Sequence, residues 1–99
     1  MPAAVLNDLE IQRALQAIPG WTRPGNQIEK SFTFAGFPEA IAFVTRLAFA
    51  AEAANHHPDI DIRWNRVRVA LSTHDARGIT ALDIDLATVA EGIARGAER

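Results

Sequence analysis

The sequence predicts an α+β fold: a two-layer sandwich in which three helices pack on one face of a four-stranded antiparallel sheet. Two observations lead to this class. The period of the apolar residues changes along the chain in the order helix, two strands, helix, two strands, helix. The strands also come in adjacent pairs with few residues between them, and connections that short join antiparallel strands. With 99 residues, no internal repeat and no linker composition, residues 1–99 are expected to form a single domain.

The helices follow from caps, breakers and apolar periodicity. Asn7 and Glu10 have the spacing of a capping box at the start of the first helix. Pro58 marks the end of the long second helix, because the residue before a proline is pushed out of the helical region. Thr80 and Asp83 repeat the capping-box spacing before the last helix. The expected elements are a helix over 8–18, a strand pair over 21–23 and 28–34, a helix over 38–54, a strand pair over 59–64 and 66–71, and a helix from 80 onward.

The strands follow from the alternation of apolar and polar residues, which is typical of a strand with one buried face. In the second pair, Ile60 and Ile62 alternate with acidic residues, and a turn at Asn65 leads into the last strand. In the first pair the turn signal lies at 24–26, and Lys30 interrupts the apolar face of its strand.

Composition excludes several classes of protein. Cysteine is absent, which excludes disulfide scaffolds, thiolate metal sites and cysteine nucleophiles. Ten basic against 12 acidic residues argue against a general affinity for nucleic acid. No apolar run approaches the roughly 20 residues that span a bilayer, and the start lacks the pattern of a secretory signal, so a cytoplasmic protein without a membrane partner is expected. Alanine supplies 19 of the apolar residues, so the core is thin and a homodimer or homotetramer is expected.

All three histidines surround the second predicted strand pair. His56 and His57 end the long helix, and His74 follows the last strand. Imidazole has an ordinary pKa of about 6.5, so two such groups around one substrate could serve as a matched acid and base. Glu52 lies four residues before His56, and we expect the two side chains to share a helix face.

Two other interpretations of the histidines stay open at this point. A histidine at a helix C-terminus is favoured by the helix dipole alone, without any function. Three histidines, with Glu52 as an optional fourth ligand, could make a catalytic zinc site with an open position. Neighbouring residues diverge at a helix end, however, so His56 and His57 are a poor ligand pair and no metal is expected.

A cluster of arginines lies in the second strand pair. Arg63, Arg66 and Arg68 surround Trp64, which could be a nucleic-acid patch with an aromatic platform. In a net acidic domain, a solvated sheet face or an oligomer contact is the favoured interpretation. No nucleic-acid partner is therefore expected.

Together these residues closely resemble the pattern of the pterin-4a-carbinolamine dehydratase family. That pattern has an acidic residue, three positions, a histidine pair with proline, then an aromatic residue, a histidine and an aspartate at set intervals. Such a spaced pattern is far more specific than a histidine pair with proline alone. The resemblance spans roughly residues 8–95, with a mild departure at Ile60, near a position that is often aromatic. The matching residues are Glu52, His56, His57, Pro58, Trp64, His74 and Asp83.

The resemblance implies the dehydration of 4a-hydroxytetrahydropterin to quinonoid dihydropterin, which recycles the cofactor of aromatic amino acid hydroxylases. This reaction involves no redox change, so no metal, nicotinamide or flavin cofactor is expected, and the sequence has no glycine-rich phosphate loop. Carried over to this chain, the resemblance makes His56 and His74 the acid/base pair and His57 a substrate-binding residue. It also implies that Glu52 orients a histidine or the pterin, and that Pro58, Trp64 and Asp83 help to form the pocket.

Two alternatives from other functional classes remain. Relatives of this fold act as binding proteins, either as a partner of a transcription activator or as an assembly factor for Rubisco. A metal-dependent hydrolase would use the same histidines in another way. The complete histidine set favours the dehydratase.

Overall fold

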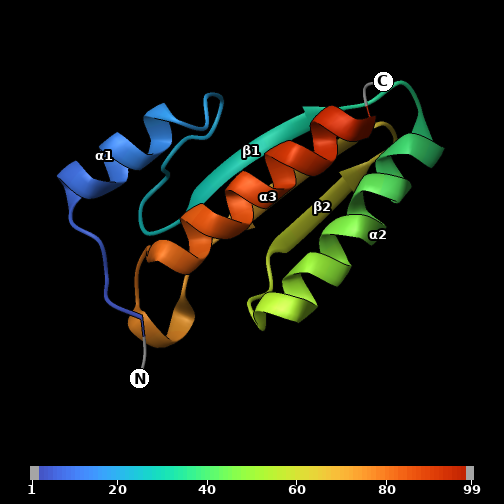
Figure 1. The fold of residues 1–99 in the computed structure, drawn as a ribbon. Helices are drawn as coiled ribbons and strands as arrows, with labels where there is room; N and C mark the ends of the chain where they lie inside the picture. The colour runs from blue at the N-terminus through green and yellow to red at the C-terminus, as the bar shows by residue number, and fades with distance from the viewer. Residues whose placement is uncertain (1–2, 98–99) are drawn as a thin grey trace.

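The computed structural model describes residues 3–97, which have an α+β fold (Figure 1). Its helices begin and end close to the positions expected from the caps, and Asn7 and Glu10 form the predicted capping box. The elements are α1 (Asp8–Gln16), β1 (Ile28–Thr33), α2 (Phe37–Ala54), β2 (Asp59–Arg63), β3 (Arg66–Leu71), a short 3-10 helix (His74–Ala76) and α3 (Ala81–Ala97).

The sheet is antiparallel, with β3 in the centre and the strand order β1-β3-β2. Ile28 pairs with Leu71 and Phe32 with Val67 between β1 and β3, while Asp59 pairs with Ala70 between β2 and β3. In Figure 1, α2 and α3 lie side by side across one face of this sheet. The α+β class expected from the sequence, with three helices and an antiparallel sheet, is therefore confirmed.

The expected fourth strand is wrong. The segment 21–23 contributes one isolated bridge, in which Thr22 and Glu29 exchange both backbone hydrogen bonds at 2.9 Å. The next hydrogen-bonded pair toward the turn would need an N–H from Pro24, and proline has none. On the other side Gly20 has a φ of +95°, which is not an extended conformation. The ladder therefore stops after a single pair, and the sheet has three strands.

The core lies between the sheet and the helices. Alternate residues of β1 and β3 point into it, as the period of a strand requires. The helices supply most of the remaining buried apolar side chains, and α1 adds Ile11. The largest fully buried apolar side chains are Phe43, Ile11, Ile28, Leu47, Leu71, Ile79, Val67 and Val69.

Lys30, which interrupts the apolar face of β1, is neutralised within the fold. Its Nζ lies 2.5 Å from Glu91 Oε1 on α3 and donates to the Pro19 carbonyl at 3.2 Å. The indole N–H of Trp21 donates to the same Glu91 oxygen at 2.9 Å. A charged residue at a core-facing position is thus compatible with the strand because it has both an ionic and a backbone partner.

Within residues 3–97, no helix combines the length and the apolar character needed to cross a membrane.

Candidate active site

The three histidines line one cleft at the end of the sheet where β2 begins and β3 ends. The antiparallel pairing of Asp59 with Ala70 brings the residues before β2 next to those after β3. His56 and His57 therefore lie beside His74, although His74 comes 17 positions after His57 in the sequence. The cleft has a volume of about 250 Å³. Its lining residues are Asn55, His56, His57, Ser72, Thr73, His74, Asp75 and Leu82.

The end of α2 determines where the adjacent histidines point. Asn55, the C-cap residue, is left-handed, with φ 50° and ψ 42°, and its N–H bonds back to the last turn of the helix. The helical spacing therefore does not continue to His56, and the expected stacking of Glu52 on His56 is wrong. Glu52 Oε1 instead lies 2.8 Å from Nε2 of His57.

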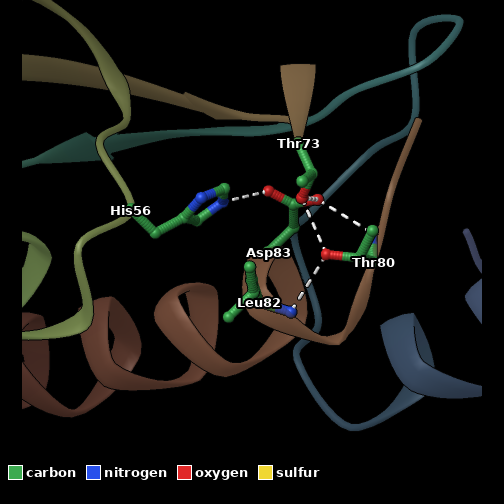
Figure 2. A network of polar contacts seen from close by, with 5 residues as sticks. All are labelled: His56, Thr73, Thr80, Leu82 and Asp83. Atoms are coloured by element: carbon green, nitrogen blue, oxygen red, sulfur yellow. Dashed lines mark hydrogen bonds and ion pairs between the residues drawn. The ribbon is translucent and has the colours of Figure 1, made fainter. Parts of the chain in front are cut away.

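His56 is part of a buried polar network (Figure 2). Its Nε2 lies 2.5 Å from Asp83 Oδ1. The other carboxylate oxygen, Oδ2, accepts hydrogen bonds from the hydroxyl of Thr73 and the backbone N–H of Thr80, both at 2.9 Å. The two threonine hydroxyls are 2.7 Å apart. Both oxygens of this buried carboxylate thus have hydrogen-bond partners, as burial of a charge requires.

His57 lies in a much more exposed position. Its side chain is 60% exposed and that of its partner Glu52 is 80% exposed. His57 also borders a second, more apolar groove of about 640 Å³ between α2 and β2. That groove is lined by Val44, Thr45, Ala48, Phe49, Ala51, Glu52, His57, Pro58 and Ile60. Glu52 and Pro58 therefore lie beside the histidine cleft, in the neighbouring groove.

Two residues expected in the pocket occupy other positions. Asp83 is fully buried behind His56, so its side chain contacts the histidine and is not accessible to a ligand in the cleft. Trp64 lies in the turn between β2 and β3, at the opposite end of β2 from Pro58, and is 69% exposed. A single chain therefore does not place the indole in the histidine cleft.

A metal centre would need several ligating side chains to converge on one point. Within residues 3–97, no group of three or more His, Cys, Asp or Glu side chains is arranged to hold a metal ion. The partners of the histidines are carboxylates in separate pairs, His56 with Asp83 and His57 with Glu52. This arrangement suits proton exchange by individual imidazoles.

Thr73 and Thr80 are the polar residues of the site that sequence reasoning missed. The capping-box spacing of Thr80 and Asp83 indicated their mutual contact, and the structure has the backbone N–H of Thr80 donating to Asp83. Nothing in the spacing indicated that His56, 27 positions earlier, would bond to the same carboxylate.

The fold and the site together define a small α+β domain with a cleft lined by three histidines, two of which are paired with carboxylates outside the cleft. Residues 4–93 match the model of the family described as pterin 4 alpha carbinolamine dehydratase. The chain belongs to this family. Its members are hydro-lyases, so the expected class of enzyme is confirmed at the level of the family.

Bacterial relatives match over nearly the whole chain. A protein of Roseiflexus castenholzii is 61% identical over 85 residues, which cover 86% of this chain and 91% of that protein. A protein of Nocardia farcinica is 52% identical over 95 residues, covering 96% of this chain and all of that protein. Both bear the name "Putative pterin-4-alpha-carbinolamine dehydratase".

Two solved structures share the fold. One is described as a transcriptional coactivator/pterin dehydratase from Brucella melitensis, with 38% identity and a TM-score of 0.88 over 91% of this chain and 98% of that chain. The other is a pterin dehydratase-like protein described as a RuBisCO assembly factor in the alpha-carboxysome. It is 22% identical, with a TM-score of 0.67 over 77% of this chain and 90% of that chain, so it supports the fold alone.

Proposed function

We propose that this protein dehydrates 4a-hydroxytetrahydropterin to quinonoid dihydropterin and water, and so recycles the pterin cofactor of aromatic amino acid hydroxylases. The observation that carries the proposal is the single cleft lined by His56, His57 and His74 in a member of the carbinolamine dehydratase family. Two histidines with different surroundings on one cleft suit a reaction that needs both an acid and a base.

The reaction moves two protons and no electrons to or from an external partner. The C4a–O bond breaks as the departing hydroxyl receives a proton, and N5 loses its proton as the new C=N bond forms. We assign these transfers to His56 and His74, which line the cleft from opposite connections, one after α2 and one after β3.

The exposed pair has a binding role in this proposal. His57 holds the substrate, and Glu52 orients His57 through the 2.8 Å contact. Pro58 forms a wall of the neighbouring groove, which His57 shares with the cleft. Asp83 acts through His56, since its side chain is buried behind that ring.

A non-catalytic binding role is the second candidate function. It is favoured by the Brucella melitensis structure, whose description includes both coactivator and dehydratase. A protein partner would contact exposed surfaces, which include His57 and Glu52, whereas the proposed proton transfers use His56 and His74 in the cleft.

We also propose that the protein is a homodimer or homotetramer joined through the free edge of β2. In an antiparallel sheet, successive residues direct their backbone N–H and C=O groups alternately to the two sides of the strand. The hydrogen bonds between Thr22 and Glu29 fix which residues of β1 face β3, and the register of the sheet carries this pattern to β2. The backbone N–H and C=O groups of Ile60 and Ile62 therefore point outward from the free edge. When two copies of β2 pair antiparallel through these groups, Asp59 of one copy lies opposite Arg63 of the other. Light scattering should give a mass at least twice the 10.8 kDa of one chain, and a monomer at micromolar concentration would contradict this proposal.

The dehydratase proposal is tested with carbinolamine generated in place by an aromatic amino acid hydroxylase. The formation of quinonoid dihydropterin is followed by absorbance with and without the protein, because the uncatalysed dehydration is itself appreciable. We expect a clear acceleration over the no-enzyme control. A rate equal to that control would overturn the proposal and leave the binding role.

A further inference from the structure

We propose that Thr73 and Thr80 are positioning residues that set the tautomer of His56. Through Asp83 they keep the proton of the neutral ring on Nε2, so that Nδ1 is the atom that exchanges protons with the cleft. The catalytic consequence of this inference rests on the proposed function, whereas the tautomer itself is a property of the free protein.

The direction of each hydrogen bond in the network follows from the groups involved. The backbone N–H of Leu82 donates to the Thr80 hydroxyl at 3.2 Å. The Thr73 hydroxyl donates to Asp83, because a carboxylate only accepts. A hydroxyl has one proton, so at the 2.7 Å contact between the two threonines it is Thr80 that donates. The chain therefore runs in one direction, from Leu82 through both threonines to Oδ2 of Asp83.

The carboxylate assigns the proton on His56, and the hydrogen bonds from Thr73 and Thr80 to Oδ2 hold that carboxylate in the orientation that meets the ring. With Asp83 as a carboxylate, the 2.5 Å contact between Oδ1 and Nε2 requires the proton to be on Nε2. Among residues 3–97, Nδ1 has no hydrogen-bond partner, and no buried side-chain nitrogen in that range is left unpaired. The Nδ1 atom is therefore accessible, and His56 lines the cleft. In Figure 2 the imidazole lies between the carboxylate and the loop that it comes from.

Burial makes the arrangement specific. Thr80 and Asp83 are fully buried and His56 and Thr73 are 8% exposed, so water does not compete for these hydrogen bonds. Asp83 lies in the first turn of α3, and its three partners come from three connections: His56 follows α2, Thr73 follows β3 and Thr80 precedes α3. Rotation of the carboxylate would break contacts to two of them at once.

Replacing the carboxylate by an amide provides a sharp test. In Asp83→Asn the two donors at the Oδ2 position, the Thr73 hydroxyl and the Thr80 N–H, select the amide oxygen. The NH₂ group then faces His56, whose Nε2 must accept, and the ring proton moves to Nδ1. If these two donors had no positioning role, the amide would be free to turn its oxygen toward His56, and that orientation keeps the proton on Nε2.

Nitrogen NMR of histidine-labelled protein distinguishes a protonated from an unprotonated ring nitrogen. We expect the Nε2–H form in the wild type, the Nδ1–H form in Asp83→Asn, and a return of Nε2–H signal when Thr73→Val is added to Asp83→Asn. Adding Thr73→Ser instead should keep the Nδ1–H form, because serine retains the hydroxyl. Thr88→Val on the exposed face of α3, which also loses one hydroxyl, is the matched control and should leave the Asp83→Asn spectrum unchanged.

An Nδ1–H neutral ring in the wild type, or an Nε2–H ring in Asp83→Asn, would overturn the inference. If Asp83→Asn does not fold, the kinetic comparison of Thr73→Val with Thr73→Ser decides, because the two variants differ in the hydroxyl that donates to Asp83.

Kinetics provide a second readout. We expect Thr73→Val to lower kcat about 10-fold with KM within about twofold, since the change acts on proton transfer and not on binding. Thr73→Ser and Thr88→Val should retain kcat. An inactive wild type would overturn the proposed function and leave the tautomer result standing, whereas the opposite tautomer in an active enzyme would overturn this inference only.

Discussion

Two histidine–carboxylate pairs lie next to each other in this protein, and their surroundings are opposite. The side chains of His56 and Asp83 are 9% and 0% exposed, with a contact of 2.5 Å. Those of His57 and Glu52 are 60% and 80% exposed, with a contact of 2.8 Å. An imidazole and a carboxylate are therefore held rigidly in the buried pair, whereas in the exposed pair the same two groups can change their relative position.

The difference originates in one backbone conformation. The left-handed Asn55 ends α2 and turns the chain, so that His56 points toward α3 and His57 stays near the last turn of α2. A buried charge-assisted pair is sensitive to the loss of either partner, while an exposed pair is screened by water and contributes little. Two adjacent residues thus differ in mobility: His56 is held in one orientation by Asp83, whereas the contact of His57 with Glu52 can adapt to a ligand.

The largest expected effect is a loss of kcat when His56 or His74, the proposed proton carriers, is replaced; for His57, the proposed binding residue, a much smaller change in kcat is expected. His56→Ala and His74→Ala should each lower kcat by about 10²- to 10⁴-fold, or roughly 3–5 kcal/mol of barrier, because each removes a positioned acid or base. The double variant should lose less than the product of the two, since paired groups act together. Rates are measured against the no-enzyme control. Single variants with full activity would contradict the assignment of roles.

The next effect compares the stability of the two pairs. Asp83→Ala leaves His56, Thr73 and the Thr80 N–H without their buried acceptor, and we expect a loss of about 3 kcal/mol in the free energy of unfolding. Glu52→Ala removes the carboxylate of the exposed pair and should cost about 0.5 kcal/mol or less. Urea unfolding of both variants measures the difference. Equal losses would mean that burial does not distinguish the pairs.

Much of the fold could be predicted because it depends on local patterns. The capping box at Asn7 and the alternation in β2 and β3 each involve residues close in sequence. The prediction of a fourth strand was wrong because it considered the pattern of side chains and not the backbone. Pro24 lacks the N–H that the next hydrogen-bonded pair needs, and Gly20 is not in an extended conformation. These are backbone properties, and they override the side-chain pattern.

The position of the three histidines could be predicted, but the partners of His56 and His57 could not. The histidines were identified from their clustering around the second strand pair, and they line one cleft. The partner of His56 was not, since Asp83 reaches it only after α2, β3 and α3 have packed. Helical spacing indicated Glu52 instead, because the sequence does not specify that Asn55 takes a left-handed conformation.

A smaller effect is expected for substrate affinity. His57→Ala should raise KM about 5- to 10-fold and change kcat by no more than about threefold, because an exposed residue contributes a binding contact and not a proton. Glu52→Gln should change KM less, since the amide still offers an oxygen to the ring. Steady-state kinetics at fixed pH measure both. A fall in kcat as large as that of His56→Ala would show that the adjustable pair also carries out proton transfer.

The smallest effect concerns Trp64, which lies at the far end of β2 from both pairs. Its φ of 53° is rare for a bulky residue, and such strain costs about 1 kcal/mol or more. Trp64→Gly removes both the indole and the strain, whereas Trp64→Ala removes the indole alone. We therefore expect the glycine variant to be more stable than the alanine variant by about 1 kcal/mol in urea unfolding.

The same two variants test whether the indole belongs to the pocket. If the site is the cleft of one chain, both variants should keep kcat and KM within about twofold of the wild type, because Trp64 is not among the cleft-lining residues. A matching rise in KM in both would instead place the indole against the substrate. Because the indole lies at the far end of β2 from the cleft of its own chain, it would then come from a second copy, and the rise should diminish when the oligomer is diluted to monomers. The pair of variants thus separates strain in the turn, which glycine alone relieves, from substrate contact, which both variants remove.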